Sequence, residues 1–400
     1  MTTTRPGSLS ALRLANRRRL LSALQDGRQI SQAELARLTG LAPATVSGLV
    51  RDLADEGELE VGEGVANGRR SRMVRRSPQR LRYGIGLYLG RAHVEAVAGT
   101  EAGDLLAESS AELAPGYTPD AAIAAIAALA ATVRERAGLT ADQVTGVAVA
   151  VPAPVDVRTG TLTEAVVLPA LDGVALRERL GPALDRPVVV ENDANLGALA
   201  LTRRAGAGAG PLVYVKVATG IGAGVAVDGR LVRGAAGSAG EIGHLPLDPG
   251  LTTVCRCGRR GCLETVGSAA AVGTALAAAL GREVGPAGLH DLIAEGHPVA
   301  ARVLEDAGEA LGRGLGWLSM VVDPAEIVLG GPLTSAGEAW LRPVVRGFRR
   351  AVLPGAARRT RISLSPLGER TESVGALIAS LTENSHIAVE MRTDKQDVNA

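Results

Sequence analysis

The chain has 400 residues, 46% of them hydrophobic and 2% aromatic, which predicts two or three domains whose cores rest on aliphatic side chains. The longest apolar run, residues 121–133, is too short to cross a bilayer, and residues 1–8 lack the apolar stretch of a secretory signal. The three cysteines all lie within residues 255–262, unlike a disulfide framework. We therefore expect a cytoplasmic protein with no membrane partner.

The net charge of +1 hides an uneven distribution along the chain. Residues 1–82 hold 15 arginines and eight acidic residues, a balance of +7, whereas the remainder has a balance of −6. A basic head on an acidic body indicates a DNA-binding module attached to a part that does not bind DNA.

The basic head has the pattern of a helix-turn-helix. Leucines predict a first helix over residues 12–24. Ser31 and Glu34 form a capping box that begins a second helix, and Gly40 ends it in a left-handed conformation. Pro43 then fits the first turn of a third helix. Apolar residues spaced along one face of that helix are expected to be buried: Val46, Leu49, Val50 and Leu53.

The third helix is predicted to read DNA, because its outer face carries small or polar residues that can approach base edges. These candidate contacts are Ala44, Thr45, Ser47 and Arg51. Two short strands, residues 59–61 and 69–76, predict a wing whose arginines neutralise phosphates or enter a narrow minor groove. The candidate wing contacts are Arg69, Arg70 and Arg72. A three-helix interaction domain is the alternative, but the three coinciding signals favour a double-stranded DNA operator as the partner.

Strands and helices alternate from residue 83 onward, which predicts an α/β body. The predicted strands cover residues 83–89, 93–98, 105–113, 144–151, 187–190, 212–217, 222–227 and 327–329. The predicted helices cover residues 121–136, 193–203, 264–280 and 299–321. The polar tail, residues 385–400, is expected to be disordered.

Three cysteines and a histidine give the strongest local signal. Cys255, Cys257 and Cys262 supply three thiolates and His244 an imidazole, which together form a tetrahedral zinc set. The alternative is three inert thiols beside a core histidine. Because protein side chains fill all four positions, the expected zinc ion is structural rather than catalytic.

Polar residues also gather where ligands bind in α/β proteins. Asn192 and Asp193 follow an apolar strand and open a helix, although a simple helix cap explains them equally well. A metal that folds the cysteine loop would hold Glu241, His244 and Glu264 close together. Carboxylates, an amide and an imidazole are suitable partners for the hydroxyl groups of a sugar.

These residues together resemble the ROK family of repressors, open reading frames and sugar kinases, over about residues 12–381. The motifs that carry the resemblance are Glu241-Ile-Gly-His244, Cys255-x-Cys257-Gly-x-x-Gly-Cys262-x-Glu264, Glu191-Asn-Asp193-Ala-Asn, Thr219-Gly-Ile-Gly222 and Gly330-Gly-Pro332. The helix-turn-helix is similar to that of the family's repressor branch, which the plain kinases lack.

The resemblance implies a fold class: a winged helix-turn-helix joined to a two-lobed, actin-like ATPase (ribonuclease H-like) α/β body. The implied domains are a head over residues 1–80, a small lobe over 81–195 completed by 370–384, and a large lobe over 196–369 that carries the zinc knuckle. It further implies a homodimer or homotetramer, and a sugar or sugar phosphate in the cleft between the lobes. The implied sugar-binding residues are Asn192, Asp193, Glu241, His244 and Glu264, and Asp193 would be the general base of a kinase.

The chain departs from the kinase pattern at the first phosphate loop. Kinases of the family carry Asp-x-Gly-Gly-Thr there, whereas this chain has Tyr88-Leu-Gly90-Arg91-Ala92. A carboxylate, a glycine and a hydroxyl group are thereby replaced. Since phosphoryl transfer depends on positioning and charge neutralisation, we expect sugar binding without catalysis.

Two smaller departures concern the ligand and the DNA contact. The stretch Val167-Leu-Pro169-Ala-Leu171 lacks the amide and the aromatic residue that are frequent in the family's cleft, and Gly48 stands where a basic residue is common. We interpret the chain as a sugar-responsive transcriptional repressor of carbohydrate uptake or metabolism genes. The alternatives are an ATP-dependent sugar kinase with an attached DNA-binding head, and a regulator controlled by a protein partner.

Overall fold

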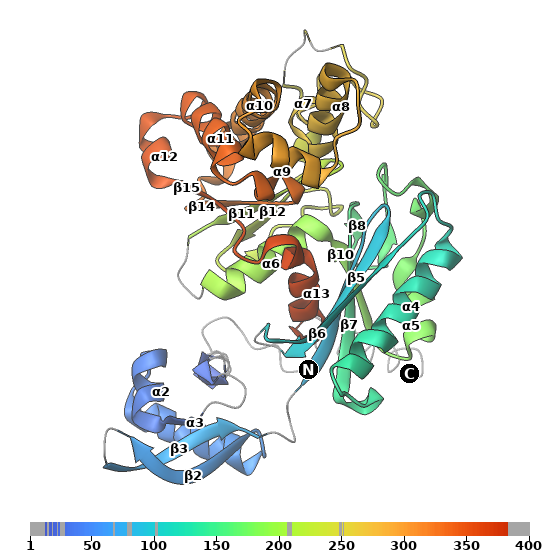
Figure 1. Cartoon of the computed structure of the whole chain (residues 1–400). Helices are drawn as coiled ribbons and strands as arrows, with labels where there is room; N and C mark the ends of the chain where they lie inside the picture. Colours follow the sequence, from blue (N-terminus) through green and yellow to red (C-terminus); the bar gives the residue numbers. More distant parts are fainter. Residues whose placement is uncertain are drawn as a thin grey trace. The chain divides into compact units, whose positions relative to one another are not determined.

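The computed structural model describes residues 13, 16–17, 19–21, 23–24, 29–66, 69–77, 82–100, 103–205, 210–247, 250 and 252–382. The chain divides into two compact units, one of residues 1–83 with 100–104 and one of residues 84–99 with 105–400 (Figure 1). The first unit holds the basic head and the second holds the α/β body.

The head is a winged helix-turn-helix. Helices α2 (Gln32–Thr39) and α3 (Pro43–Asp55) are joined at Gly40, whose φ of 63° is the left-handed conformation predicted for it. Ser31 caps α2, because its Oγ accepts a hydrogen bond of 3.2 Å from the amide of Glu34. The wing is an antiparallel sheet in the order β1 (Ile30–Ser31), β3 (Arg69–Arg76) and β2 (Leu59–Ala66).

The apolar face of α3 forms the centre of the head's core, as its spacing predicts. The buried side chains of this core include Leu20, Leu24, Leu35, Val46, Leu49, Val50 and Leu53. The described residues between Arg13 and Ala23 are helical, which confirms a first helix over that part. Leu12 lies outside the described residues.

The body contains two five-stranded sheets with the same internal order. The first runs β10 (Val188–Asn192), β7 (Val144–Val151), β4 (Tyr83–Leu89), β5 (His93–Thr100), β6 (Leu105–Glu112). The second runs β15 (Arg361–Leu364), β14 (Glu326–Gly330), β11 (Leu212–Val217), β12 (Ile221–Val227), β13 (Arg230–Leu231). In each sheet the first strand along the chain is central, with its next two strands on one side and its last two on the other. This repeated order confirms the ribonuclease H-like, actin-like fold class.

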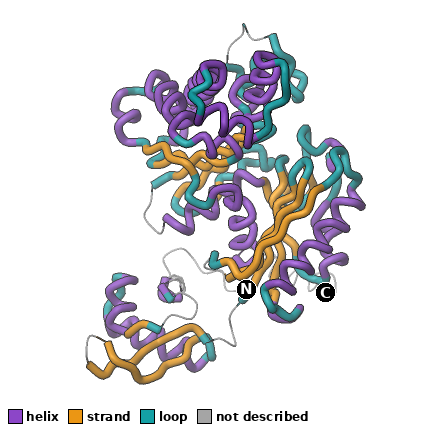
Figure 2. The backbone as a smooth tube through the Cα atoms, viewed as in Figure 1, coloured by secondary structure: helices purple, strands orange, loops and turns teal. Residues whose placement is uncertain are grey.

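Helices cover the outer face of each sheet (Figure 2). Helices α4 (Pro119–Arg136) and α5 (Leu176–Leu184) pack on the first sheet through residues such as Ile126 and Leu180. Helices α8 (Ala269–Leu280), α10 (Pro298–Val322) and α11 (Glu338–Ala351) cover the second sheet.

Two helices lie between the sheets. Helix α6 (Asp193–Ala205) packs against both sheets, and α13 (Thr371–Thr382) packs against α6 and β7. A Cβ at Gly375 would lie 1.9 Å from the carbonyl oxygen of Leu196, so the close approach of α13 to α6 requires a glycine at this position. Helix α6 contacts both sheets, so its contacts do not assign it to one lobe. The lobe boundaries expected from the sequence stay a prediction.

The structure also corrects the predicted elements. The helix predicted over 264–280 is two helices, α7 (Glu264–Gly267) and α8, because Ser268 is extended and caps the second one. Six elements were not predicted from the sequence: α5, α9 (Pro286–Ala294), α11, α12 (Pro354–Arg359), α13 and β15. Within the described residues no helix combines the length and the apolarity needed to cross a membrane. The tail expected to be disordered lies outside the described residues.

Candidate functional site

The candidate DNA-binding residues lie on the exposed side of the head. The four predicted contacts of α3 are all exposed, opposite its buried face: Ala44, Thr45, Ser47 and Arg51. The hydroxyl of Ser47 donates a 3.0 Å hydrogen bond to Gln32, so the first residue of α2 is attached to the same surface.

The wing arginines differ in their surroundings. Arg70 and Arg72 are two residues apart on β3, are both exposed and therefore share one face of the hairpin. Arg75 instead pairs with Glu60 of β2, with 2.5 Å between the guanidinium and the carboxylate. The backbone of Arg69 begins β3, whereas its side chain lies outside the described part. Among the wing arginines whose side chains the structure describes, Arg70 and Arg72 are the exposed ones.

The five candidate sugar-binding residues line one cleft of the body. They are Asn192, Asp193, Glu241, His244 and Glu264. Tyr88 and Arg91 of the first predicted phosphate loop line the same cleft, together with residues 219–222, which run from the turn after β11 into the start of β12. Ala92 is exposed next to Arg91. The structure thus brings together residues that are separated by more than 170 positions in sequence.

Asn192 and Asp193 stand where β10 ends and α6 begins. The amide oxygen of Asn192 accepts a hydrogen bond from the backbone of Asn195, so this side chain caps α6. Its Nδ2 donates to the carbonyl of Ala153 at 3.2 Å. Asp193 accepts from the amide of Ala194 through Oδ1 and is nearly buried, with 6% of its side chain exposed. Both the cap and the cleft position expected from the sequence are therefore present.

The cleft is rich in carboxylates. Burial, and then repulsion from Asp193 and Glu264, raises the pKa of Glu241 to about 7. Glu264 is buried, and Arg256 faces its Oε2 at 3.4 Å. Glu164 lies at the same cleft and was not among the predicted residues. Such oxygens are acceptors for hydroxyl donors.

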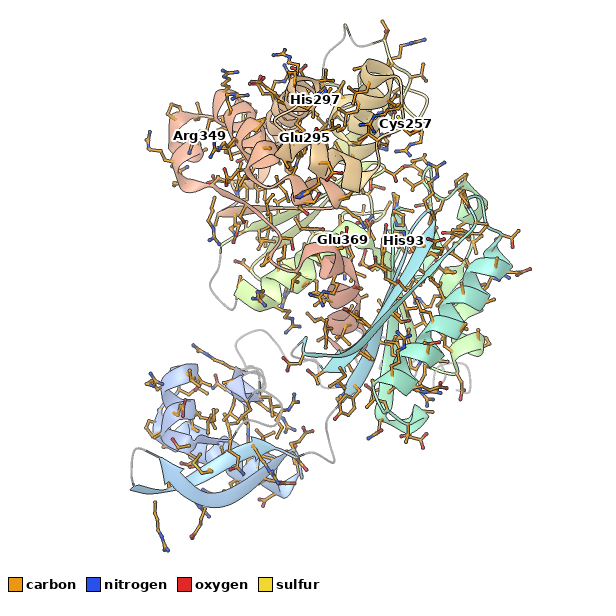
Figure 3. The ribbon with its side chains drawn as sticks, in the orientation of Figure 1. His93, Cys257, Glu295, His297, Arg349 and Glu369 are labelled. Atoms are coloured by element: carbon orange, nitrogen blue, oxygen red, sulfur yellow. The ribbon has the colours of Figure 1, made fainter. Side chains whose placement is uncertain are left out.

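A buried lysine at the floor of the cleft was also missed from the sequence. Lys216 of β11 lies 3.0 Å from Oδ2 of Asp193 and 3.3 Å from Oε1 of Glu372, the second residue of α13. Its ammonium group is 3.7 Å from the centroid of the Tyr88 ring. The ring of His93, labelled in Figure 3, packs against the Tyr88 ring at a tilted angle of 56°, with 5.4 Å between the ring centroids. Lys216, itself on the second sheet, therefore contacts one residue of the first sheet and one residue of each central helix.

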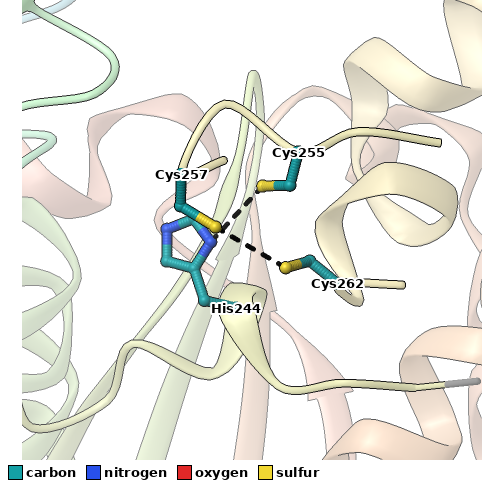
Figure 4. A group of neighbouring side chains, drawn as sticks. All are labelled: His244, Cys255, Cys257 and Cys262. Carbon is teal, nitrogen blue, oxygen red and sulfur yellow. Dashed lines mark hydrogen bonds between the residues drawn. The ribbon is translucent and has the colours of Figure 1, made fainter. Parts of the chain in front are cut away.

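The candidate metal ligands converge on one point. His244, Cys255, Cys257 and Cys262 have ligand atoms that all lie within 4.8 Å of one another. Figure 4 shows these four side chains gathered together. Cys257 Sγ is 3.7 Å from Cys262 Sγ, and Cys255 Sγ is 3.5 Å from His244 Nδ1. Tetrahedral ligands at zinc distances would be about 3.8 Å apart for two sulfurs and about 3.6 Å for sulfur and nitrogen. These two observed distances fit that geometry.

The head is a winged helix-turn-helix, and the body is a ribonuclease H-like fold with a carboxylate-lined cleft. Together they define a class of proteins in which a DNA-binding module is joined to a ligand-binding body. The model of the ROK family matches residues 84–383, and a model described as winged helix-turn-helix DNA-binding matches residues 13–57. The chain belongs to the ROK family.

Relatives include both repressors and kinases. The chain is 26% identical over 392 residues to the xylose repressor of Caldicellulosiruptor bescii, covering 94% of this chain and 98% of that protein. It is 30% identical over 245 residues to the glucokinase of Halalkalibacterium halodurans, covering 58% of this chain and 74% of the kinase. The crystal structure of a ROK transcriptional regulator, a homologue of the E. coli Mlc protein, superimposes with a TM-score of 0.73 over 92% of this chain and 95% of that one, at 23% identity.

Proposed function

We propose that the protein is a sugar-responsive repressor of genes for carbohydrate uptake or metabolism. The observation that carries the proposal is that one chain holds both an exposed winged helix-turn-helix surface and a carboxylate-lined cleft. The relatives that match nearly the whole chain, head included, are repressors such as the xylose repressor. With a DNA operator as its partner, the protein would act in the cytoplasm.

The cleft would hold the sugar through five side chains. Asp193, Glu241 and Glu264 accept hydrogen bonds from sugar hydroxyls, and Asn192 supplies an amide. His244 has Nδ1 directed at Cys255, which leaves Nε2 as the nitrogen for the ligand. Since these residues come from segments that pack on both sheets, a bound sugar would favour one arrangement of the two lobes.

A zinc ion would be held by His244, Cys255, Cys257 and Cys262. When bound, it would stabilise the fold of the cysteine loop and would not take part in a reaction, because all four ligand positions are protein side chains. His244 lies 11 residues before Cys255, and Glu264 lies two residues after Cys262. The metal would therefore fix two of the sugar-binding side chains.

The DNA would be contacted by the α3 surface and by the wing. Ala44, Thr45, Ser47 and Arg51 would face base edges, and Arg69, Arg70 and Arg72 would face phosphates or the minor groove. A homodimer or homotetramer would place two heads on two half-sites of an operator. Sugar binding would change the affinity for the operator by a coupling of about 1–3 kcal/mol, which corresponds to about 5–150-fold.

An ATP-dependent sugar kinase with a DNA-binding head is the second candidate. It is favoured by the 30% identity to a glucokinase. We propose instead that the body does not transfer phosphate, because Tyr88, Arg91 and Ala92 replace the carboxylate, glycine and hydroxyl of the first phosphate loop.

A coupled assay of ADP release with Mg·ATP and a panel of hexoses, pentoses and amino sugars separates the two candidates. We expect no turnover above background, beside retained binding of duplex DNA. Turnover that depends on both sugar and Asp193 would establish the kinase. Protein that binds no duplex at low ionic strength would refute the repressor.

A further inference from the structure

Lys216 is an unusual residue for its position. It occupies a central strand, β11, and is paired in register with Gly222 of β12 and Gly330 of β14. Its side chain is 10% exposed, and both carboxylates that contact it are less exposed still, at 6% for Asp193 and 5% for Glu372. A buried cation persists only when it is paired, so these contacts hold it in place.

The surroundings keep the charge on this lysine. Burial alone lowers the pKa of Lys216, but the carboxylates of Asp193 and Glu372 outweigh it and raise that pKa well above 10.5. The hydroxyl of Tyr214 donates a 2.6 Å hydrogen bond to Glu372 and so satisfies the same oxygen. Burial also raises the pKa of Tyr88 to about 12, which leaves a neutral ring facing the ammonium group. Lys216 is therefore a fixed cation at neutral pH.

The cations at the cleft are mostly committed to partners within the protein. Lys216 contacts two carboxylates, and Arg256, in the adjoining cavity, contacts Glu264 and the carbonyl of Thr219. Arg91 is the other guanidinium at the cleft. The acidic side chains that line the cleft are Glu164, Asp193, Glu241 and Glu264. A phosphate group would meet more carboxylates than available cations, whereas a neutral polyol offers them hydroxyl donors.

We infer that Lys216 is a tethered cation that holds Asp193 as a fixed hydrogen-bond acceptor, so that the cleft binds an uncharged sugar without nucleotide or divalent metal. Lys216 is thus a positioning residue, acting on the ligand through Asp193. This inference rests on the proposed effector function and narrows its ligand from a sugar or sugar phosphate to an uncharged sugar.

Three variants of the full chain test the role of the lysine. Lys216→Met leaves Asp193 and Glu372 facing each other without a cation, and we expect a lower thermal midpoint. Lys216→Met/Glu372→Gln removes one positive and one negative charge, and we expect it to recover at least half of that loss. Glu372→Gln alone keeps the Lys216–Asp193 pair and serves as the matched control. Equal midpoints for the wild type and Lys216→Met would overturn the inference.

Calorimetric titration then tests the ligand. The probes are D-glucose, D-xylose, D-mannose and N-acetyl-D-glucosamine, each hexose also as its 6-phosphate, with EDTA or with Mg·AMP-PNP. We expect at least one uncharged sugar to bind equally well under both conditions and its 6-phosphate to bind at least tenfold more weakly. The charge-balanced double variant should lose at least tenfold in affinity, whereas Glu372→Gln should stay within threefold. Ethylammonium chloride should restore sugar binding to Lys216→Ala, and choline chloride should not.

The outcomes separate the inference from the function on which it rests. Tighter binding of the phosphate ester, a requirement for Mg·AMP-PNP, or wild-type affinity in the double variant would overturn the inference and leave a sugar-responsive regulator standing. If no sugar and no phosphate ester binds, the effector function itself is refuted, and the ligand class with it. The thermal midpoints still report on the lysine in that case.

Discussion

Two exposed arginines of the wing allow the DNA contact to be tested without knowledge of the operator. Each phosphate contact contributes about 0.9 to the slope of log affinity against log salt. Arg70→Ala/Arg72→Ala removes two exposed cations from one head, so the slope should become less steep by about 1.8 per head. When the salt concentration rises fourfold, each phosphate contact lowers the affinity by a factor of about 3.5. The affinity loss of the double variant over this rise should therefore be about 12-fold smaller, per head, than that of the wild type. Fluorescence anisotropy with a duplex of arbitrary sequence measures both slopes.

Arg75→Ala is the matched control for this experiment. It removes an arginine from the same strand, but one that already pairs with Glu60. Its slope should stay close to that of the wild type. The reasoning fails if the double variant keeps the wild-type slope, or if Arg75→Ala changes the slope as much as the loss of Arg70 and Arg72.

Three further predictions concern the metal, the pH and the packing. Cys257→Ser should reduce bound zinc, measured by elemental analysis, and should weaken sugar affinity at least tenfold, because the same metal would hold His244 of the sugar site. One zinc per chain with unchanged sugar affinity would contradict this. Because the pKa of Glu241 is raised to about 7, its ionised acceptor form is lost as the pH falls through 7. Sugar affinity should therefore fall by up to tenfold per pH unit below 7, and Glu241→Gln should flatten this dependence of affinity on pH. The same raised pKa favours the folded state below about pH 4.5, and that contribution is lost as the pH rises through 7; urea unfolding at several pH values tests the sign. Gly375→Ala should cost about 1–3 kcal/mol of unfolding free energy, since its Cβ would meet the backbone of Leu196, whereas Gly273→Ala, with open space around it, should be neutral or stabilising by up to about 1 kcal/mol.

The head was the part most accessible from the sequence. Its helix signals are local. Ser31 caps α2 by a hydrogen bond with a residue only three positions further along the chain, and Gly40 ends the same helix in a left-handed conformation. The apolar face of α3 is periodic over a single helix. Such short-range features specify structure without knowledge of the rest of the fold.

The body was predicted less completely for a physical reason. Helix α11 was missed because Pro343 and several arginines interrupt its pattern, although Trp340, Val344 and Phe348 repeat at four-residue spacing on its buried face. That spacing is a signal that could have identified it. Strand β15 has only four residues, too few for a recognisable alternation.

The cleft shows the same limit. The motifs placed Asn192, Asp193, Glu241, His244 and Glu264 at one cleft, and the structure brings them together. Lys216 was missed, because a single lysine in an apolar strand carries no sign of its partners. Its neighbours Tyr214 and Glu372 are 158 residues apart in sequence and meet only through the packing of α13. Contacts of this range cannot be inferred from the spacing within one segment.

The central claim is that occupancy of the cleft is reported to DNA. Genome-wide mapping of bound sites supplies the operator fragments, and the neighbouring genes indicate which sugar to use. The decisive measurement is the affinity for such a fragment, by fluorescence anisotropy, with and without that sugar. The account predicts that saturating sugar changes the affinity by about 5–150-fold, and that Asp193→Asn abolishes the change. An operator affinity that is the same with and without the sugar, in protein that calorimetry shows to be sugar-bound, would contradict it.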